Sequence, residues 1–145
     1  MSISANLTPQ QNCLILDLDL DLVLDLVLAH NAPVNFRKLE VYQFAVRFLP
    51  LSVRISDGLP QRYAGLADQL RRASLSIPLN IAEGSGKTTG PDQRRFYAMA
   101  RGSAMECAAI IDACSALGLI ETSQAMEADR LLVAVVRMLS KMCRG

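Results

Sequence analysis

Apolar residues recur every three or four positions along most of the chain, which is the spacing of amphipathic α-helices. The pattern predicts four helices, at about residues 35–56, 63–84, 91–117 and 122–142. Turn residues separate them: Gly58 and Pro60 follow the first helix, a loop with three glycines follows the second, and Gly118 ends the third. Helices joined by such short turns predict an all-α fold, an antiparallel up-down-up-down four-helix bundle.

The first of these helices is apolar on two sides. One stripe has the spacing of a bundle core and comprises Leu39, Tyr42, Val46, Leu49 and Val53. The other comprises Val41, Phe44, Phe48, Leu51 and Ile55. A helix with two apolar sides needs two partners, so we expect the first stripe in the core and an oligomer interface in addition to it.

The same periodicity predicts the inward positions of the other three helices. In chain order these are Leu66, Leu70, Ala73, Ile77 and Ile81; Phe96, Met99, Ser103, Cys107, Ile110, Cys114 and Leu117; and Met126, Leu132, Val136, Leu139 and Met142. Pro91 is expected in the first turn of the third helix, and Thr122 or Ser123 is expected to cap the fourth.

Residues 1–33 form an N-terminal extension ahead of the bundle domain of residues 34–145. The leucines of the extension alternate from Leu14 to Leu28 as in a β-strand, yet Thr8, Pro9 and Gln11 form a good helix start. A helix would also gather three of its four aspartates on one side. We therefore favour a helix that packs its apolar surface on the bundle or on a neighbouring subunit.

The charge of the chain is unevenly distributed, although the net charge is only +1. The extension has four aspartates and no Lys or Arg, whereas residues 34–145 carry a net charge of +5. The aspartates argue against a membrane span, and the N-terminus lacks the features of a secretory signal. Four cysteines without a CxxC pair and a single histidine do not form a zinc set. We expect a cytoplasmic protein without a metal, a cofactor or a membrane partner.

Polar residues at steps of three or four form a second face on the helix at 63–84. They are Gln69, Arg72, Ser76, Asn80 and Glu83. A solvated face is one explanation, but exposed helices more often carry Lys, Glu and Gln than Ser and Asn, which are weak helix formers. Short polar groups suit close packing, within the bundle or between subunits, and direct contact of Arg72 and Asn80 with a ligand or nucleic acid is the third alternative.

Two segments of the chain resemble a known family of bacterial proteins. The segments are "LADQLRRASLSIPLNIAEGSG" and "FYAMARGSAMECAAIIDACSALGLI". They match the paired motif of the four-helix-bundle proteins encoded by the intervening sequence of 23S ribosomal RNA genes. The matching positions are Gln69, Arg72, Ala73, Ser76, Ile77, Asn80, Ile81, Ala82, Glu83 and Gly84 in the first segment, and Phe96, Ala100, Arg101, Gly102, Ser103 and Glu106 in the second.

The resemblance covers about residues 36–142 and carries its own expectations. It implies a four-helix bundle that assembles into a ring-like homopentamer. It also implies kinship with the accessory variability determinant of diversity-generating retroelements, which binds nucleic acid and is the partner of a reverse transcriptase.

The basic residues between positions 54 and 101 provide a candidate binding surface. This window has eight basic side chains and four acidic ones. Repeated around an oligomer, such an excess would bind RNA or DNA backbones without sequence preference and with strong salt dependence. The candidate contacts are Arg71, Lys87, Arg94 and Arg95. Two alternatives remain: the arginines only make ion pairs on a solvated face, or the oligomer is a scaffold that docks a partner protein such as a reverse transcriptase.

The sequence does not indicate an enzyme. The segment "GSGKTTG" lacks the spacing of a phosphate-binding loop and joins two helices instead of following a strand. His30 has no evident acid or nucleophile partner. Glu83 and Glu106 are expected to approach Arg72 and Arg101 across the second and third helices, in a structural ion-pair network and not a catalytic pair.

Overall fold

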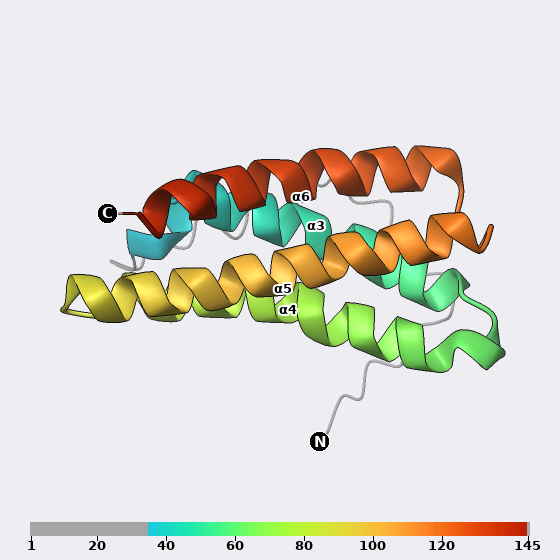
Figure 1. Cartoon of the computed structure of the whole chain (residues 1–145), viewed down its shortest axis with the longest axis horizontal. Helices are drawn as coiled ribbons and strands as arrows, with labels where there is room; N and C mark the ends of the chain where they lie inside the picture. The colour runs from blue at the N-terminus through green and yellow to red at the C-terminus, as the bar shows by residue number, and fades with distance from the viewer. Residues whose placement is uncertain (1–34, 145) are drawn as a thin grey trace, which may run out of the picture. The chain divides into compact units, whose positions relative to one another are not determined.

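The computed structural model describes residues 35–144, which fall within one compact unit of residues 33–145. The prediction of a helix in the N-terminal extension lies outside the described residues. The described elements are a 3-10 turn η1 (Asn35–Lys38), helix α3 (Glu40–Gly58), a 3-10 turn η2 (Gln61–Tyr63), and helices α4 (Ala64–Ser85), α5 (Gly90–Ala116) and α6 (Thr122–Met142) (Figure 1). The part of the chain that the structure describes contains no β-strand.

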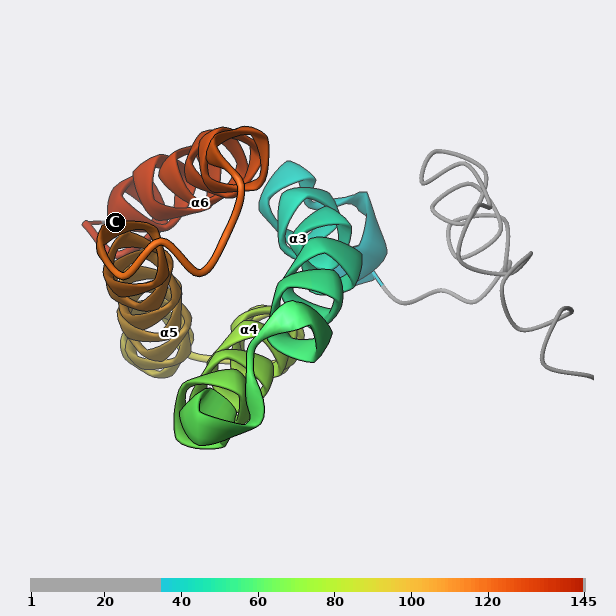
Figure 2. The same ribbon diagram turned by 90° about the vertical axis from the view of Figure 1, so that its right-hand side faces the viewer.

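The four α-helices pack as a bundle in which each helix contacts its neighbours along the chain. Helices α3 and α4, α4 and α5, and α5 and α6 pack side by side, and α6 closes the arrangement against α3. Viewed end-on, the helices occupy the four corners of a quadrilateral (Figure 2). The predicted all-α four-helix bundle is therefore confirmed.

Aliphatic side chains from all four helices fill the space between them. The largest fully buried side chains are Phe48, Leu51 and Ile55 of α3; Leu70, Ile77 and Ile81 of α4; Cys107 and Cys114 of α5; and Leu131, Leu132, Val135 and Leu139 of α6. Each large apolar side chain of this kind contributes about 1.5–3 kcal/mol when it is removed from water. The inward face predicted for α4 is confirmed, except that Leu66 is only half-buried.

The prediction for α3 selected the wrong stripe. Val41, Phe48, Leu51 and Ile55 of the second stripe are buried, whereas Val53 of the first stripe is exposed and its other members are half-buried. The reason is that small residues accompany the second stripe and let α4 approach closely. One of them is Ser52, whose Oγ donates a hydrogen bond to Ser74 Oγ of α4 at 2.9 Å. Counting only large apolar residues misses such positions.

Small residues also determine which side of α5 faces the core. Tyr97, Ala100 and Ala104 are buried, whereas the predicted Met99 and Leu117 are exposed. Phe96 and Ser103 are half-buried, so the prediction was wrong by one position in the N-terminal half of the helix. Alanines allow α4 and α5 to pack closely there, and the bulkier methionine is left outside. The prediction was correct for Cys107, Ile110 and Cys114.

The last helix departs from the prediction at its start. Leu132 and Leu139 are buried as predicted, and Val136 and Met142 pack against the core, but Met126 is 69% exposed. This methionine lies within the first two turns of α6, next to an open groove.

Two local motifs form the turn between α5 and α6. Gly118 has a φ of +66° and allows Leu119 N–H to donate to Cys114 O, at 2.9 Å, so that Leu119 folds back onto the core. The N-cap of α6 is Glu121, whose carboxylate and the side chain of Gln124 form a reciprocal capping box. The expectation that Thr122 or Ser123 caps this helix was therefore wrong.

Candidate nucleic-acid interface

The polar face of α4 lies along the seam between α4 and α5. The hydroxyl oxygens of Ser76 and Ser103 are 2.9 Å apart, and Gln69 Nε2 donates to Glu106 Oε1. Asn80 Nδ2 donates to the carbonyl and the hydroxyl oxygen of Ser76, both at 2.9 Å. Ser76 and Asn80 are half-buried. Within one chain, this face thus fastens two helices together.

The polar contacts across this seam differ from the ion-pair network that the sequence predicted. Glu83 accepts from Lys87 Nζ at 3.2 Å, one turn further along the chain. Arg72 donates to Gln69 Oε1 at 2.6 Å, and Glu106 accepts from the same glutamine. Among the residues that the structure describes, Glu83 and Glu106 form no ion pair with Arg72 or Arg101. The amide of Gln69 takes the place of the expected cross-helix arginine.

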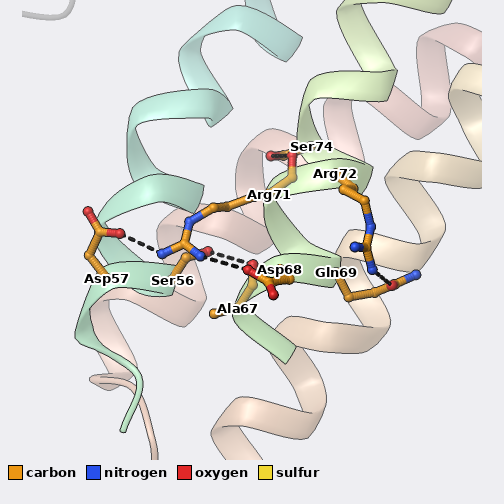
Figure 3. A network of polar contacts seen from close by, with 8 residues as sticks. All are labelled: Ser56, Asp57, Ala67, Asp68, Gln69, Arg71, Arg72 and Ser74. Atoms are coloured by element: carbon orange, nitrogen blue, oxygen red, sulfur yellow. Dashed lines mark hydrogen bonds and ion pairs between the residues drawn. The ribbon is translucent and has the colours of Figure 1, made fainter. Parts of the chain in front are cut away.

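Arg71 lies on the other side of α4, facing α3 (Figure 3). Its guanidinium contacts Asp57 Oδ1 at 2.7 Å and Asp68 Oδ1 at 3.2 Å. The hydrogen bond to Asp57 raises the pKa of Arg71 above its already high ordinary value. Two carboxylates offset this charge, so Arg71 is a weak candidate for a phosphate contact.

Lys87, Arg94 and Arg95 lie together at the turn between α4 and α5, about 24 Å along α4 from Arg71. Contacts between residues of the turn and the start of α5 hold it in place. Gln93 Nε2 donates to Lys87 O at 2.9 Å, and Lys87 Nζ lies 4.5 Å from the ring centroid of Phe96. Arg94 and Arg95 are exposed. The structure thus brings together three of the four predicted contacts and leaves Arg71 apart.

The antiparallel topology brings further basic residues to the same end of the bundle. Helix α3 begins there and α6 ends there; Cys143 Sγ lies 4.0 Å from Arg94 O, and Leu39 and Met142 line one hollow. We call this region the basic end. It carries seven basic side chains, Arg37, Lys38, Lys87, Arg94, Arg95, Lys141 and Arg144, and three acidic ones, Glu40, Glu83 and Asp92.

The opposite end of the bundle is close to neutral in charge. It carries five basic side chains, Arg54, Arg62, Arg71, Arg72 and Arg130, and six acidic ones, Asp57, Asp68, Asp112, Glu121, Glu127 and Asp129. The positive window predicted at residues 54–101 is therefore divided between the two ends. Counting charges by bundle end, once the four helices were predicted, would have identified Lys38, Lys141 and Arg144.

Two cysteines of α5 are buried in the core. Burial, with a smaller contribution from Glu106, raises the pKa of the Cys107 thiol to about 12, and burial also raises the pKa of Cys114. Thiols of this kind are poor nucleophiles near neutral pH. Within residues 35–144, no group of three or more His, Cys, Asp or Glu side chains is placed to hold a metal ion. None of the described helices is long and apolar enough to cross a membrane.

Comparison with known proteins identifies the family. A search among curated proteins gave no significant match. The sequence model of the family described as "23S rRNA-intervening sequence protein" matches residues 37–141, which span α3 to α6 and include both halves of the paired motif. The chain therefore belongs to the family of 23S rRNA-intervening sequence proteins.

Proposed function

We propose that this protein is a non-enzymatic, homo-oligomeric scaffold that binds RNA or DNA backbones through its basic end. The observation that carries the proposal is the concentration of seven basic side chains against three acidic ones at one end of a bundle whose other end is nearly neutral. Phosphate backbones bind such surfaces with little sequence preference. In this proposal the scaffold acts in the cytoplasm as an accessory protein.

A ring-like homopentamer, which the family resemblance implies, would strengthen this binding. Copies related by rotation about an axis parallel to the helices place all their basic ends on the same side. The net charge of about +4 at each basic end is then multiplied by the number of copies. Few aromatic side chains are available for base stacking, since the chain has four Phe, three Tyr and no Trp. The proposed binding is therefore electrostatic, to backbone and not to bases.

The test replaces Arg94 and Arg95 with alanine in the full chain. The probes are a fluorescently labelled mixed-sequence RNA and a duplex DNA, titrated at several salt concentrations. The matched control replaces Arg62 and Arg130, which are exposed at the opposite end, with alanine. We expect the Arg94/Arg95 variant to lose affinity and to lower the slope of log K against log salt by roughly 2 per chain engaged, since each phosphate contact contributes about 0.9 for duplex DNA. The control should change both quantities much less.

Equal effects of the two variants, or no effect of either, would contradict binding at the basic end. An oligomer of unchanged size that binds neither probe would favour the alternative, in which the scaffold docks a partner protein such as a reverse transcriptase without contacting nucleic acid. Light scattering of the wild-type protein on a sizing column tests the assembly separately. The expected mass is about five times the 15.8 kDa of one chain.

A further inference from the structure

An apolar groove runs along the seam between α5 and α6, on the outside of the bundle. It consists of two adjoining hollows of about 290 and 150 Å³, which share Ala108, Asp129 and Leu132. Its walls include large apolar side chains that are exposed to solvent, with Met126 at 69% and Met105 at 56%. Charged residues stand at its rim, Asp112 and Asp129 towards the start of α6 and Arg137 further along. Within residues 35–144 these three charges form no ion pair.

An exposed apolar ridge lies on the outward face of α4. Leu75 and Leu79, one turn apart, are 51% and 59% exposed, although leucine is a typical core residue. Arg72 precedes them on the same face and Glu83 follows them. The face thus presents, in chain order, the positive charge of Arg72, two exposed leucines and the carboxylate of Glu83, which also accepts from Lys87 Nζ at 3.2 Å.

We propose that the α4 ridge of one copy of this chain docks in the α5–α6 groove of the next copy, with Leu75 and Leu79 in the two hollows. This inference rests on the proposed homo-oligomeric scaffold and names the two surfaces that build it. The two leucines lie one helical turn apart, and the two hollows adjoin along α6, so one leucine is available for each hollow. A helix packed in a groove through such anchors is a common recognition mode.

The order of charges along the two surfaces fixes the direction of docking. With α4 parallel to the neighbour's α6, Arg72 lies at the end of the groove that carries Asp112 and Asp129, and Glu83 lies towards Arg137. The antiparallel arrangement would bring Arg72 to Arg137 and Glu83 to Asp129, with like charges together. Arg72 and Glu83 are about 16 Å apart along α4, and Asp129 and Arg137 about 12 Å along α6, a difference that long side chains span.

Parallel docking through two different surfaces is compatible with a closed ring. Helices α4 and α6 are parallel within one chain, so copies rotated about an axis along the bundle keep every α4 parallel to every α6. In the end-on view, α6 lies diagonally across from α4, and α5 lies to one side of that diagonal (Figure 2). The groove is lined by residues of α5 and α6 and therefore does not lie directly opposite α4. Successive copies are therefore turned relative to one another. A head-to-tail contact with such a rotation closes when the angle permits.

The test uses two full-length variants, each with one surface disabled. The ridge variant carries Leu75→Glu and Leu79→Glu, and the groove variant carries Met126→Glu and Val133→Glu. All four positions are at least 45% exposed, and Glu is a good helix former, so both variants should fold. We expect each variant alone to be monomeric by light scattering. An equimolar mixture should form a heterodimer of about twice the 15.8 kDa chain mass, through the intact groove of one and the intact ridge of the other.

The matched control carries Val53→Glu, the same change at an exposed apolar position of α3 outside both surfaces. It should assemble like the wild type. A control that is monomeric while the ridge and groove variants assemble would place the interface on α3 and overturn the inference. Variants that are each monomeric but do not pair when mixed would contradict a head-to-tail contact. A monomeric wild-type protein would contradict the proposed scaffold itself, whereas a wild-type oligomer unaffected by either variant would contradict only the interface.

A charge exchange tests the direction of docking. Arg72→Glu should weaken assembly, because it places a carboxylate beside Asp112 and Asp129 of the next copy. Adding Asp129→Arg to the same chain should restore assembly, because every contact in the ring then has the exchanged pair. In the antiparallel arrangement the glutamate of Arg72→Glu would face Arg137, so strengthened assembly of this single variant would overturn the proposed direction.

Discussion

Gly84 illustrates how a single residue sets the distance between two helices. It is buried in the last turn of α4, and a Cβ at this position would lie 2.8 Å from Cε1 of Tyr97 and 3.0 Å from Cβ of Phe96. Both neighbours belong to α5, so the aromatic ring rests directly on the backbone of α4. Gly102 differs, because a Cβ there would meet nothing within 4 Å.

These two glycines of the paired motif should respond oppositely to the same substitution. Gly84→Ala should destabilise the fold by about 1–3 kcal/mol, because the added methyl group displaces the buried ring of Tyr97. Gly102→Ala should stabilise it by about 0.5–1 kcal/mol, because alanine is the better helix former and the space is open. Urea unfolding followed by circular dichroism measures both. A neutral Gly84→Ala would show that α4 and α5 can separate without cost.

The buried thiol of Cys107 makes stability depend on pH in the alkaline range. In the folded state its pKa is about 12, against 9.0 for the ordinary group, so the unfolded state loses the proton first as pH rises. The contribution of the thiol to stability is complete below about pH 9 and is lost progressively towards pH 12. At pH 10 this loss amounts to about 1.4 kcal/mol.

The comparison of two alanine variants isolates this effect. Between pH 8 and pH 10, the Cys107→Ala variant should lose about 1.4 kcal/mol less stability than the wild type. The control is Cys143→Ala, at a half-buried position near the chain end, which should follow the wild type. The measurement is the free energy of unfolding in urea at the two pH values. Identical losses in all three proteins would show that the Cys107 thiolate is accommodated in the fold.

Individual side chains were predicted well where burial and hydrophobicity coincide and poorly where they do not. Leu70, Ile77 and Ile81 are large, apolar and buried, as predicted. Met99 is equally apolar but exposed, while Ala100 next to it is fully buried. Periodicity gives the spacing of a helical face, and close packing decides which of two adjacent faces is turned inward.

Helix ends show the same distinction at the level of elements. Gly118 was predicted to end α5 because only a residue without a Cβ adopts a positive φ easily, and the structure agrees. At the start of α6 the sequence predicted Thr122 or Ser123 as the cap, whereas the structure uses Glu121, a residue with a weaker statistical preference for this position. Its advantage is the second bond of the capping box, which Glu121 N–H donates to Gln124 Oε1 at 3.1 Å.

The cap assignment predicts unequal costs for two adjacent substitutions. Glu121→Ala should destabilise the fold by about 1 kcal/mol, because it leaves an N–H group at the start of α6 without its partner. Thr122→Ala should change stability by less than about 0.5 kcal/mol, because an exposed side chain without a capping bond is lost. Thermal unfolding of the two variants distinguishes them. A larger loss of stability from Thr122→Ala would indicate that Thr122 is the cap, as the sequence predicted.

At the scale of the whole molecule, topology assembles surfaces that no sequence window contains. The basic end joins residues as distant as Lys38 and Arg144, because an even number of antiparallel helices returns the chain to its starting end. The predicted group of Arg71, Lys87, Arg94 and Arg95 shared one window of sequence but divides between two ends. The α5–α6 groove was equally invisible to periodicity, since each of the two helices supplies part of its lining, Met105 and Ala108 from α5 and Met126 and Leu132 from α6.

The two proposals combine in one prediction about avidity. A ring presents several basic ends on one side, so a long nucleic acid can contact several copies at once, and each further contact is intramolecular. The ridge variant Leu75→Glu and Leu79→Glu keeps every residue of the basic end but should be monomeric. We expect it to bind a long mixed-sequence RNA on the order of 100-fold or more weakly than the wild type, with a shallower salt dependence.

The length of the probe separates lost avidity from a damaged binding surface. On an RNA too short to reach a second copy, the variant should approach the affinity of the wild type, apart from the repulsion added by two glutamates on α4. Restoring dimers by mixing with the groove variant should recover part of the affinity for the long RNA. Equal losses on the short and long probes would mean that α4 itself contacts the nucleic acid, and the ridge would then belong to the binding surface and not to the contact between copies.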